Sequence, residues 1–277
     1  MRGPDAKPVD PFLPFGNSRL VFYPKLCPIN KRVMRTTAQG LTGQRVVLLG
    51  ASSGIGLATA KKAAAEGAGV VIVSGNRQRV DKALKELPEG SEGYAIDLSK
   101  EENIRDFFSS MGRFDHLVYS AGENLVLSPI AQTDIGQARE FFTVRFWGAF
   151  AAAKYAAPLI NEGGSIGFTS GTASIRPGAG WSVASAICGA MEGLVRALAV
   201  ELSPIRVNCV VPGVIMTPLW NSMDVQKRDE LFQQSGKSSL VKRVGQPDDV
   251  ADGFLYLMKQ RNGTGQSLLI DGGASLV

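Results

Sequence analysis

A glycine-rich run at residues 49–56, Leu-Gly-Ala-Ser-Ser-Gly-Ile-Gly, gives this sequence its first chemical signal. Glycines let the backbone turn sharply and approach a pyrophosphate, whose charge is favoured by the free amides at a helix start. The run follows a short apolar segment and precedes a helical period, which is the context that a dinucleotide site requires. A tight strand-to-helix corner would be the purely structural explanation. We predict that a dinucleotide is bound by Gly50, Ser52, Ser53, Gly54, Ile55 and Gly56.

The segment after the second apolar run indicates which dinucleotide is bound. NAD sites usually place a carboxylate here for the ribose 2′-hydroxyl, whereas a 2′-phosphate needs cations. The chain reads Ser74-Gly75-Asn76-Arg77, and no acidic residue occurs before Asp81. An arginine can pair with a phosphate through two parallel hydrogen bonds, although one at a helix start can also be simply solvated. The pattern favours NADP(H) over NAD(H), held by Ser74, Asn76 and Arg77.

Short apolar runs that alternate with helical periods must position these residues. Strands are predicted at Arg45–Leu49, Gly69–Ser74, Gly93–Ile96, His116–Ser120, Ser165–Ser170, Arg206–Val211 and Ser267–Ile270, and helices at 54–66, 78–87, 100–111, 134–160, 184–202 and 247–259. Several of these strands are apolar on both faces, as in parallel sheets covered by helices. Residues 40–277 are therefore predicted to form one α/β domain, a Rossmann-type doubly wound parallel sheet of about seven strands with helices on both faces. Ligands of such sheets bind beyond the carboxyl ends of the strands.

Residues 1–39 differ in composition from the rest of the chain. They include six prolines before residue 29, without an amphipathic period, and we predict an extended, Pro-rich basic arm. The net charge of +5 arises within residues 1–35, which leaves 23 basic against 23 acidic side chains in the remainder. A neutral body offers no net attraction to a phosphate backbone, so no nucleic-acid partner is expected.

Composition also excludes several kinds of site. The 277 residues hold three cysteines and one histidine, too few for a zinc cage or a disulfide framework, so we expect no metal and reduced thiols in a cytoplasmic protein. A Ser-His-Asp hydrolase would depend on His116, which falls in a strand-like run. No stretch reaches 18 consecutive apolar residues, and the first thirty lack the apolar run of a secretory signal, so no membrane association is expected.

From about residue 43 to the C-terminus the sequence resembles the short-chain dehydrogenase/reductase family. The glycine run is similar to its cofactor turn, and Tyr119-Ser120-Ala121-Gly122 stands where the family has Asn-Asn-Ala-Gly. Val244-Gly245-Gln246-Pro247 and Asp271-Gly272-Gly273 match its ending. The resemblance implies the doubly wound fold, a homodimer or homotetramer, and a small-molecule substrate. It also implies further cofactor-binding residues, namely Asp97, Leu98, Ser120, Ala121, Gly122, Pro212, Gly213, Val214 and Thr217.

The same resemblance indicates that the catalytic residues of the family are missing from this chain. Family members use an Asn, a Ser, a Tyr and a Lys to deliver a proton as hydride moves between nicotinamide and substrate. The matching positions here are Arg145, Gly171, Ala184 and Cys188, so all four residues are missing. Positioned general acid catalysis is typically worth about 10²–10⁴-fold, and simple ketone reduction should be impaired accordingly. Reduction of an iminium acceptor needs no proton in the same step, so it would not be impaired.

Two side chains near the altered tetrad are candidates for catalysis. A guanidinium at Arg145 could polarise a carbonyl, stabilise an enolate or clamp a carboxylate, but it cannot act as an acid at neutral pH. Its alternative role is a structural salt bridge. Ser170, at the end of the fifth strand, could orient a substrate oxygen or merely cap the strand end. Cys188 is expected to be a buried, inert thiol.

The substrate pocket is predicted from the segments that follow the fifth and sixth strands. Trp181 precedes the missing tyrosine by three residues and could wall the pocket. Residues 214–244 read as a long irregular stretch with apolar side chains, among them Met216 and Trp220, and the family uses this segment as a substrate lid. Simple packing against the body is the competing interpretation. The apolar composition of residues 214–244 predicts a hydrophobic substrate.

These observations predict an NADP(H)-dependent short-chain oxidoreductase with an atypical active site. It would transfer hydride between nicotinamide and a hydrophobic carbonyl or imine/iminium substrate by a tyrosine-independent mechanism. Two alternatives stay open. The chain could be a catalytically degenerate NADP(H)-binding sensor, or a biosynthetic enzyme that uses the pocket as a template for another reaction.

Overall fold

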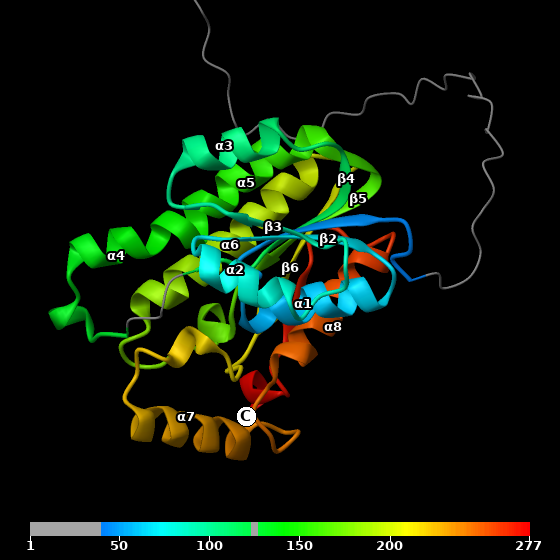
Figure 1. Cartoon of the computed structure of the whole chain (residues 1–277). Helices are drawn as coiled ribbons and strands as arrows, with labels where there is room; N and C mark the ends of the chain where they lie inside the picture. The colour runs from blue at the N-terminus through cyan, green and yellow to red at the C-terminus, as the bar shows by residue number, and fades with distance from the viewer. Residues whose placement is uncertain (1–39, 123–126) are drawn as a thin grey trace, which may run out of the picture. The chain divides into compact units, whose positions relative to one another are not determined.

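The computed structural model describes residues 40–122 and 127–277, and the predicted N-terminal arm lies outside these residues. Seven parallel strands form one sheet in the order β3-β2-β1-β4-β5-β6-β7, which confirms the predicted doubly wound fold (Figure 1). The strands are β1 Arg45–Leu49, β2 Gly69–Ser74, β3 Glu92–Ala95, β4 Phe114–Tyr119, β5 Ile160–Thr169, β6 Arg206–Pro212 and β7 Ser267–Ile270. The order reverses between β1 and β4, where ligands of such sheets bind.

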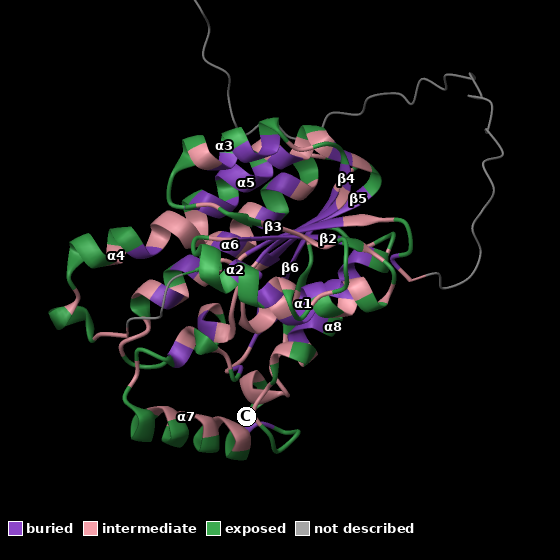
Figure 2. Ribbon diagram, in the orientation of Figure 1, coloured by how far each residue is buried: buried purple, intermediate pink, exposed green. Residues whose placement is uncertain are grey.

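Alternate residues along each strand enter two separate cores. In β1, Val46 and Leu48 belong to one core and Val47 and Leu49 to the other. Helices α1 (Gly54–Ala65), α2 (Arg77–Leu84) and α8 (Pro247–Lys259) cover the first face, and α3 (Glu101–Ser109), α5 (Ala149–Ala156) and α6 (Ser182–Glu201) cover the second (Figures 1 and 2). The central strands β1, β4 and β6 are almost wholly buried, whereas the edge strands β3 and β7 are partly exposed. Side chains on both faces explain why these strands are continuously apolar. The remaining α-helices are α4 Ile135–Phe142 and α7 Val225–Ser238.

The prediction of a single helix over 134–160 is wrong in one respect. A π-helical turn at Thr143–Gly148 separates α4 from α5, and a short 3₁₀ turn, Ala157–Leu159, ends the helical segment before β5 begins at Ile160. A π turn adds one residue to the helical ladder and shifts the side chains that follow. Apolar periodicity over a long window does not register one extra residue, so the sequence pattern missed the turn.

The irregular stretch predicted over 214–244 is also wrong, because it contains α7. The side chain of Asp224 caps this helix by accepting hydrogen bonds from the amides of Gln226 and Lys227, at 3.1 and 3.2 Å. An aspartate at an N-cap is a recognised helix signal and could have revealed α7. No residue of α7 is fully buried, so the helix lacks the apolar stripe on which the prediction depended.

Among the described helices, α6 alone is long and apolar enough to cross a membrane by length and composition. The core helix of a globular domain passes the same test. Here Ile187, Met191 and Val195 form a buried stripe in the core on one face of the sheet. This stripe accounts for the apolar character of α6 through packing.

Candidate functional site

The loops after β1 and β4 meet at the point where the strand order reverses. Gly50 has a φ of +90°, and a Cβ at this position would collide with the backbone of Ala121. The amide of Ser120 donates to the carbonyl of Leu49 at 2.8 Å. Glycine at position 50 is required both by the turn and by the close approach. The structure thus brings two predicted cofactor-binding segments into contact.

The start of α1 is open to an anion. The N-cap residue Ser53 makes no side-chain capping bond, and the first turn contains no acidic residue. A Cβ on Gly54, whose φ is +53°, would lie 3.4 Å from the side chain of Thr217. The predicted nicotinamide-side residue Thr217 therefore faces the glycine turn. First-turn amides without a side-chain cap and a positive dipole end fit the pyrophosphate of a dinucleotide.

The segment after β2 places its polar side chains beside the glycine turn. The hydroxyls of Ser52 and Ser74 are 2.8 Å apart, and Asn76 caps α2 by accepting from the amide of Arg79 at 2.9 Å. Arg77 forms an ion pair with Asp81 one turn along α2, and this pairing raises the pKa of the guanidinium. Both side chains are solvent-exposed, so the pair is weak and a 2′-phosphate can compete for Arg77.

The remaining predicted cofactor residues lie on neighbouring strand ends. The Asp97 carboxylate accepts from the amide and hydroxyl of Ser99, at 3.0 and 2.6 Å, and these bonds lower its pKa. Leu98 is buried in the core. Pro212 ends β6, and the next residue, Gly213, donates its amide to the carbonyl of Ile270 at 3.0 Å. Asp97 and Gly213 therefore flank the β1/β4 switch point from opposite halves of the sheet.

Arg145 occupies the π turn and reaches the end of β4. A Cβ built on Gly122 would lie 2.6 Å from its Cζ atom, so the guanidinium is packed directly against that glycine. The Cζ atom also lies 4.6 Å from the centroid of the Phe141 ring, within cation–π distance. The cation is held between an aromatic face and the backbone of a predicted cofactor-binding residue. Sequence reasoning missed the role of Phe141, which lies four residues earlier on the same helical face.

The other three tetrad positions gather around one thiol. A Cβ on Gly171 would lie 3.2 Å from Sγ of Cys188, and Ala184 precedes Cys188 by one turn of α6. Burial raises the pKa of the Cys188 thiol, which the positive charge of Arg145 partly opposes. The thiol is therefore protonated at neutral pH. Gly171, Ala184 and Cys188 supply neither a phenol nor an ammonium group.

The side-chain contacts of Ser170 connect the end of β5 to α6. Its hydroxyl lies 3.1 Å from the carbonyl oxygen of Cys188 and 3.3 Å from Oε1 of Glu192, both on α6. Ser174 donates to the same Glu192 oxygen at 2.5 Å. These bonds fasten the end of β5 to α6, which favours the capping role over the predicted orientation of a substrate oxygen. Sequence reasoning missed that Glu192 contacts both hydroxyls.

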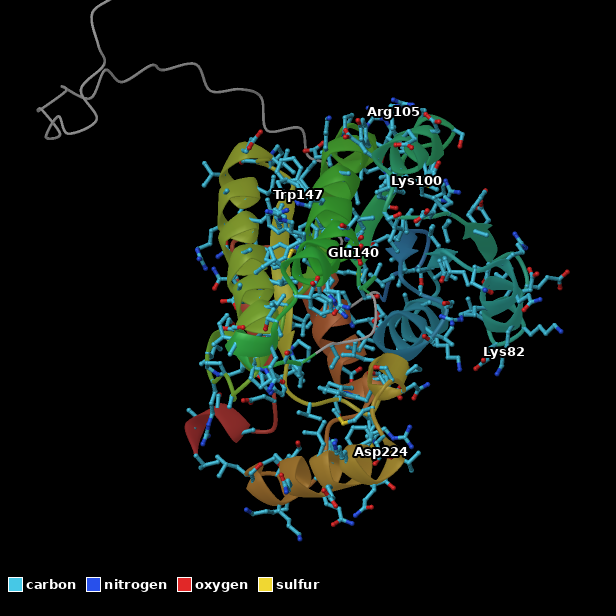
Figure 3. The ribbon with its side chains drawn as sticks, turned by 90° about the vertical axis from the view of Figure 1, so that its left-hand side faces the viewer. Lys82, Lys100, Arg105, Glu140, Trp147 and Asp224 are labelled. Atoms are coloured by element: carbon cyan, nitrogen blue, oxygen red, sulfur yellow. The ribbon has the colours of Figure 1, made fainter. Side chains whose placement is uncertain are left out.

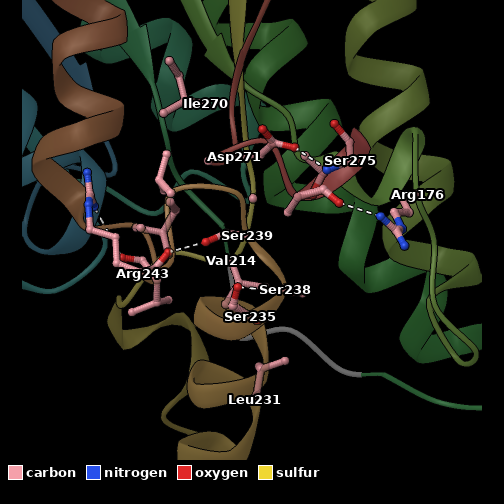
Figure 4. A pocket seen from close by; sticks show the side chains of 18 of the residues that line it. Arg176, Val214, Leu231, Ser235, Ser238, Ser239, Arg243, Ile270, Asp271 and Ser275 are labelled. Atoms are coloured by element: carbon pink, nitrogen blue, oxygen red, sulfur yellow. Dashed lines mark hydrogen bonds between the residues drawn. The ribbon is translucent and has the colours of Figure 1, made fainter. Parts of the chain in front are cut away.

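A cavity of about 470 Å³ opens between α7, the loop after β5 and the C-terminal segment (Figure 4). Its walls include Trp181, Val214 and Leu231, with hydroxyls from Ser235 and Ser238 on α7. The helix that the sequence pattern missed thus forms one side of the cavity. The predicted nicotinamide residues Gly213 and Val214 form another, which joins the cavity to the cofactor side.

Only one of the three predicted pocket residues lines this cavity. Trp181 does, whereas Met216 and Trp220 do not. The Trp220 ring is buried 6.4 Å from that of Trp181, and its indole N–H donates to the carbonyl of Ile215 at 2.9 Å. Trp220 therefore supports the wall from behind. The Met216 sulfur lies 3.1 Å from the side-chain amide of Gln246.

Metal-ligating side chains do not cluster in the described part of the chain, where no group of three or more His, Cys, Asp or Glu could hold an ion. The single histidine, His116, is buried between Ser165 and Gln44, with ring nitrogens 2.8 and 2.6 Å from their side-chain oxygens. It serves the packing of the sheet, at the end opposite the site.

Comparison with known proteins agrees with this geometry. A family model described as enoyl-(acyl carrier protein) reductase matches residues 50–275. The chain is 35% identical over 251 residues to the short-chain dehydrogenase/reductase ATR9 of Stachybotrys chlorohalonatus, covering 85% of this chain and 98% of that protein. It is 30% identical over 253 residues to the short-chain dehydrogenase/reductase MalC of Malbranchea aurantiaca, covering 85% and 96%.

Solved structures give the same result. A small-chain dehydrogenase in complex with NADPH is similar with a TM-score of 0.76 and 34% identity, covering 84% of this chain and 99% of that one. The MalC reductase/Diels-Alderase of Malbranchea aurantiaca is similar with a TM-score of 0.78 and 30% identity, covering 85% and 97%. The family model and these relatives span nearly the whole described domain. The chain belongs to the short-chain dehydrogenase/reductase family.

Proposed function

We propose that the chain is an NADP(H)-dependent oxidoreductase that transfers hydride between nicotinamide and a hydrophobic carbonyl, imine or iminium substrate without a catalytic tyrosine. The observation that carries this proposal is the Arg145 guanidinium packed against Gly122, at the family's asparagine position. The other three tetrad positions hold Gly171, Ala184 and Cys188, none of which can donate a proton at neutral pH as the tyrosine does. Arg145 is then the polar group that replaces the tetrad.

The residues present fit a nicotinamide dinucleotide. The open first turn of α1 can take the pyrophosphate, and Gly50 and Gly56 pack closely against the segment after β4 beside that turn. Ser74 and Arg77 can receive a 2′-phosphate, and one similar structure is a complex with NADPH. When bound, the cofactor supplies the hydride. We therefore favour NADP(H) over NAD(H).

The guanidinium would act on the developing negative charge of the substrate. As hydride reaches a carbonyl carbon, the π electrons of the C=O bond move to the oxygen, and the N–H groups of Arg145 stabilise that charge. Arginine keeps its proton at neutral pH, so the alkoxide takes its final proton from water. An iminium ion becomes a neutral amine on hydride addition and needs no proton.

The cavity supports a hydrophobic substrate with a few polar groups. Trp181 and Leu231 offer apolar contact area, and the hydroxyls of Ser235 and Ser238 can accept hydrogen bonds from a substrate. The Ser238 hydroxyl itself donates to the carbonyl of Ser235 at 3.2 Å. A volume of about 470 Å³ accommodates a drug-sized molecule. This supports a substrate larger than a simple sugar or short-chain ketone.

Oxidation of NADPH across a panel of bulky carbonyl, imine and iminium compounds tests the proposal. We expect turnover with at least one acceptor, which Arg145→Met should reduce about 10²-fold or more while NADPH affinity is preserved. Arg145→Lys keeps the charge but loses the planar donor array, and should retain part of the activity. Tight NADPH binding without turnover of any acceptor would instead indicate a binding protein.

A second function is favoured by one relative, since MalC is named a reductase/Diels-Alderase. A pocket without a proton donor could hold a reactive intermediate in a productive shape while it cyclises. Mass spectrometry separates the two activities, because reduction adds two hydrogens to a carbonyl or imine, or one hydride to an iminium ion, whereas cyclisation leaves the mass of the substrate unchanged. Both products would form if reduction generates the intermediate that cyclises.

A further inference from the structure

Tyr119 ends the central strand β4 and is only 2% exposed. It stands between Leu49 of β1 and Phe168 of β5 in the sheet register. Its hydroxyl donates to the carbonyl oxygen of Val144 at 2.6 Å, and thereby links the sheet to the π turn. Tyr119 stands where the family motif has its first asparagine, so this contact is made by a residue in which the chain departs from that motif.

The acceptor of this hydrogen bond is the residue directly before Arg145. In an α-helix the Val144 carbonyl would be bonded four residues ahead, whereas in a π turn the ladder shifts by one residue. A turn with a shifted ladder has weaker internal support, so an outside donor contributes more to its shape. The phenol supplies such a donor from the rigid centre of the sheet.

Gly148, the last residue of the π turn, makes room for the phenol. A Cβ there would collide with the Tyr119 hydroxyl and would lie 2.8 Å from the carbonyl oxygen of Leu98. The glycine is therefore a steric requirement of the Tyr119–Val144 bond. Tyrosine at 119, the π turn and glycine at 148 form one interdependent arrangement.

The end of β4 and the residues that follow it contact the π turn at two points, one on its backbone and one on the side chain of Arg145. Tyr119 fastens the backbone before Arg145, and Gly122, three residues further along, packs against the guanidinium. We propose that Tyr119 is a positioning residue that fixes the π turn and so directs Arg145 toward Gly122. The consequence for catalysis rests on the proposed function, whereas the consequence for the position of Arg145 does not.

Tyr119→Phe tests this inference with the full chain, since it removes only the hydroxyl. Tyr155→Phe is the matched control, because that hydroxyl donates to Glu101 at 2.6 Å on the outer surface of α5. The first readout needs no substrate. It combines the side-chain Nε resonance of Arg145, assigned by its loss in Arg145→Met, with amide hydrogen exchange of residues 143–149.

We expect Tyr119→Phe to shift the Arg145 resonance and to speed exchange in the π turn about tenfold, while Tyr155→Phe changes neither. An unchanged resonance with unchanged exchange would overturn the inference, whether or not the protein turns over a substrate. A lower melting temperature alone, without a change at Arg145, would reduce Tyr119 to a packing residue and overturn it equally.

The second readout is kinetic and uses whichever acceptor the panel identifies. Tyr119→Phe should lower kcat about tenfold with NADPH affinity unchanged, because a small displacement of a catalytic group is costly. In the Arg145→Met background the same change should cause no further loss. A shifted Arg145 resonance in a protein without any turnover would support the positioning role and contradict only the proposed function.

Discussion

The guanidinium of Arg145 lies against the α-carbon of Gly122, so close that a Cβ on Gly122 would be 2.6 Å from Cζ of the arginine. The two residues are 23 positions apart and meet only because the π turn faces the end of β4. The position of the guanidinium therefore depends on the absence of a side chain at Gly122.

Gly122→Ala should move the guanidinium while leaving the fold intact. The far end of an arginine side chain is flexible, so we expect a stability loss below about 1 kcal/mol. Turnover should fall about tenfold or more, and in the Arg145→Met background Gly122→Ala should cause little further loss. Steady-state kinetics and thermal melting measure both effects. Gly189→Ala is the control, because a Cβ there meets no atom within 4 Å; activity equal to this control in Gly122→Ala would contradict the prediction.

Arg77→Ala should distinguish the two nicotinamide cofactors. If Arg77 holds the 2′-phosphate, calorimetry should show NADPH affinity reduced about 10- to 100-fold, with NADH affinity nearly unchanged. Lys82→Ala removes one positive charge from the same helix and should affect NADPH far less. Asp81→Asn removes the competing carboxylate and should leave NADPH affinity equal or higher. Equal loss for both cofactors in Arg77→Ala would assign the phosphate to another residue.

His116 should make stability depend on pH in the weakly acidic range. Burial, and next the positive charge of Arg206, lower its pKa from 6.5 to about 4. Between these values the unfolded chain binds a proton that the folded protein does not, so stability falls as pH decreases from about 6.5 to about 4. The full effect is about 3 kcal/mol.

Urea unfolding between pH 7 and pH 5 measures this effect. Carboxylates such as Asp97 and Asp271, whose pKa values are lowered, lose their contribution mainly at more acidic pH. His116→Asn should be less stable at pH 7, because it loses the bonds to Ser165 and Gln44. Its stability should change less between pH 7 and pH 5. An equally steep change in the variant would show that other groups cause the pH dependence.

Trp147 and Phe150 predict the surface through which copies of the chain associate. Trp147, labelled in Figure 3, lies in the π turn, and Phe150 lies in the first turn of α5. Their exposed fractions are 60% and 41%, and their ring centroids are 6.2 Å apart. Adjoining exposed aromatic rings favour burial in an interface. We expect a homodimer or homotetramer that Trp147→Arg dissociates in sedimentation, whereas Val225→Arg on the exposed start of α7 should not. Unchanged sedimentation of Trp147→Arg would exclude this surface.

The order of the elements could be predicted because it depends on local patterns. Strands β1, β2 and β7 begin and end where the apolar runs do, and the glycine turn lies between β1 and α1 as expected. β-branched runs, glycines with positive φ and helical periodicity act over a few residues. Each of them is fully present in the printed sequence.

Contacts between distant segments could be determined only by the tertiary structure. The alignment by sequence placed Arg145 at a tetrad position, but its packing against Gly122 and its support by Tyr119 depend on how the π turn meets β4. The turn itself arises from one extra residue, which periodicity does not register. Trp220 lies behind the cavity wall because its indole bonds a carbonyl five residues earlier. Sequence patterns specify which face of an element is apolar, whereas the positions of polar groups in a site follow from packing between elements, and packing is a property of the whole fold.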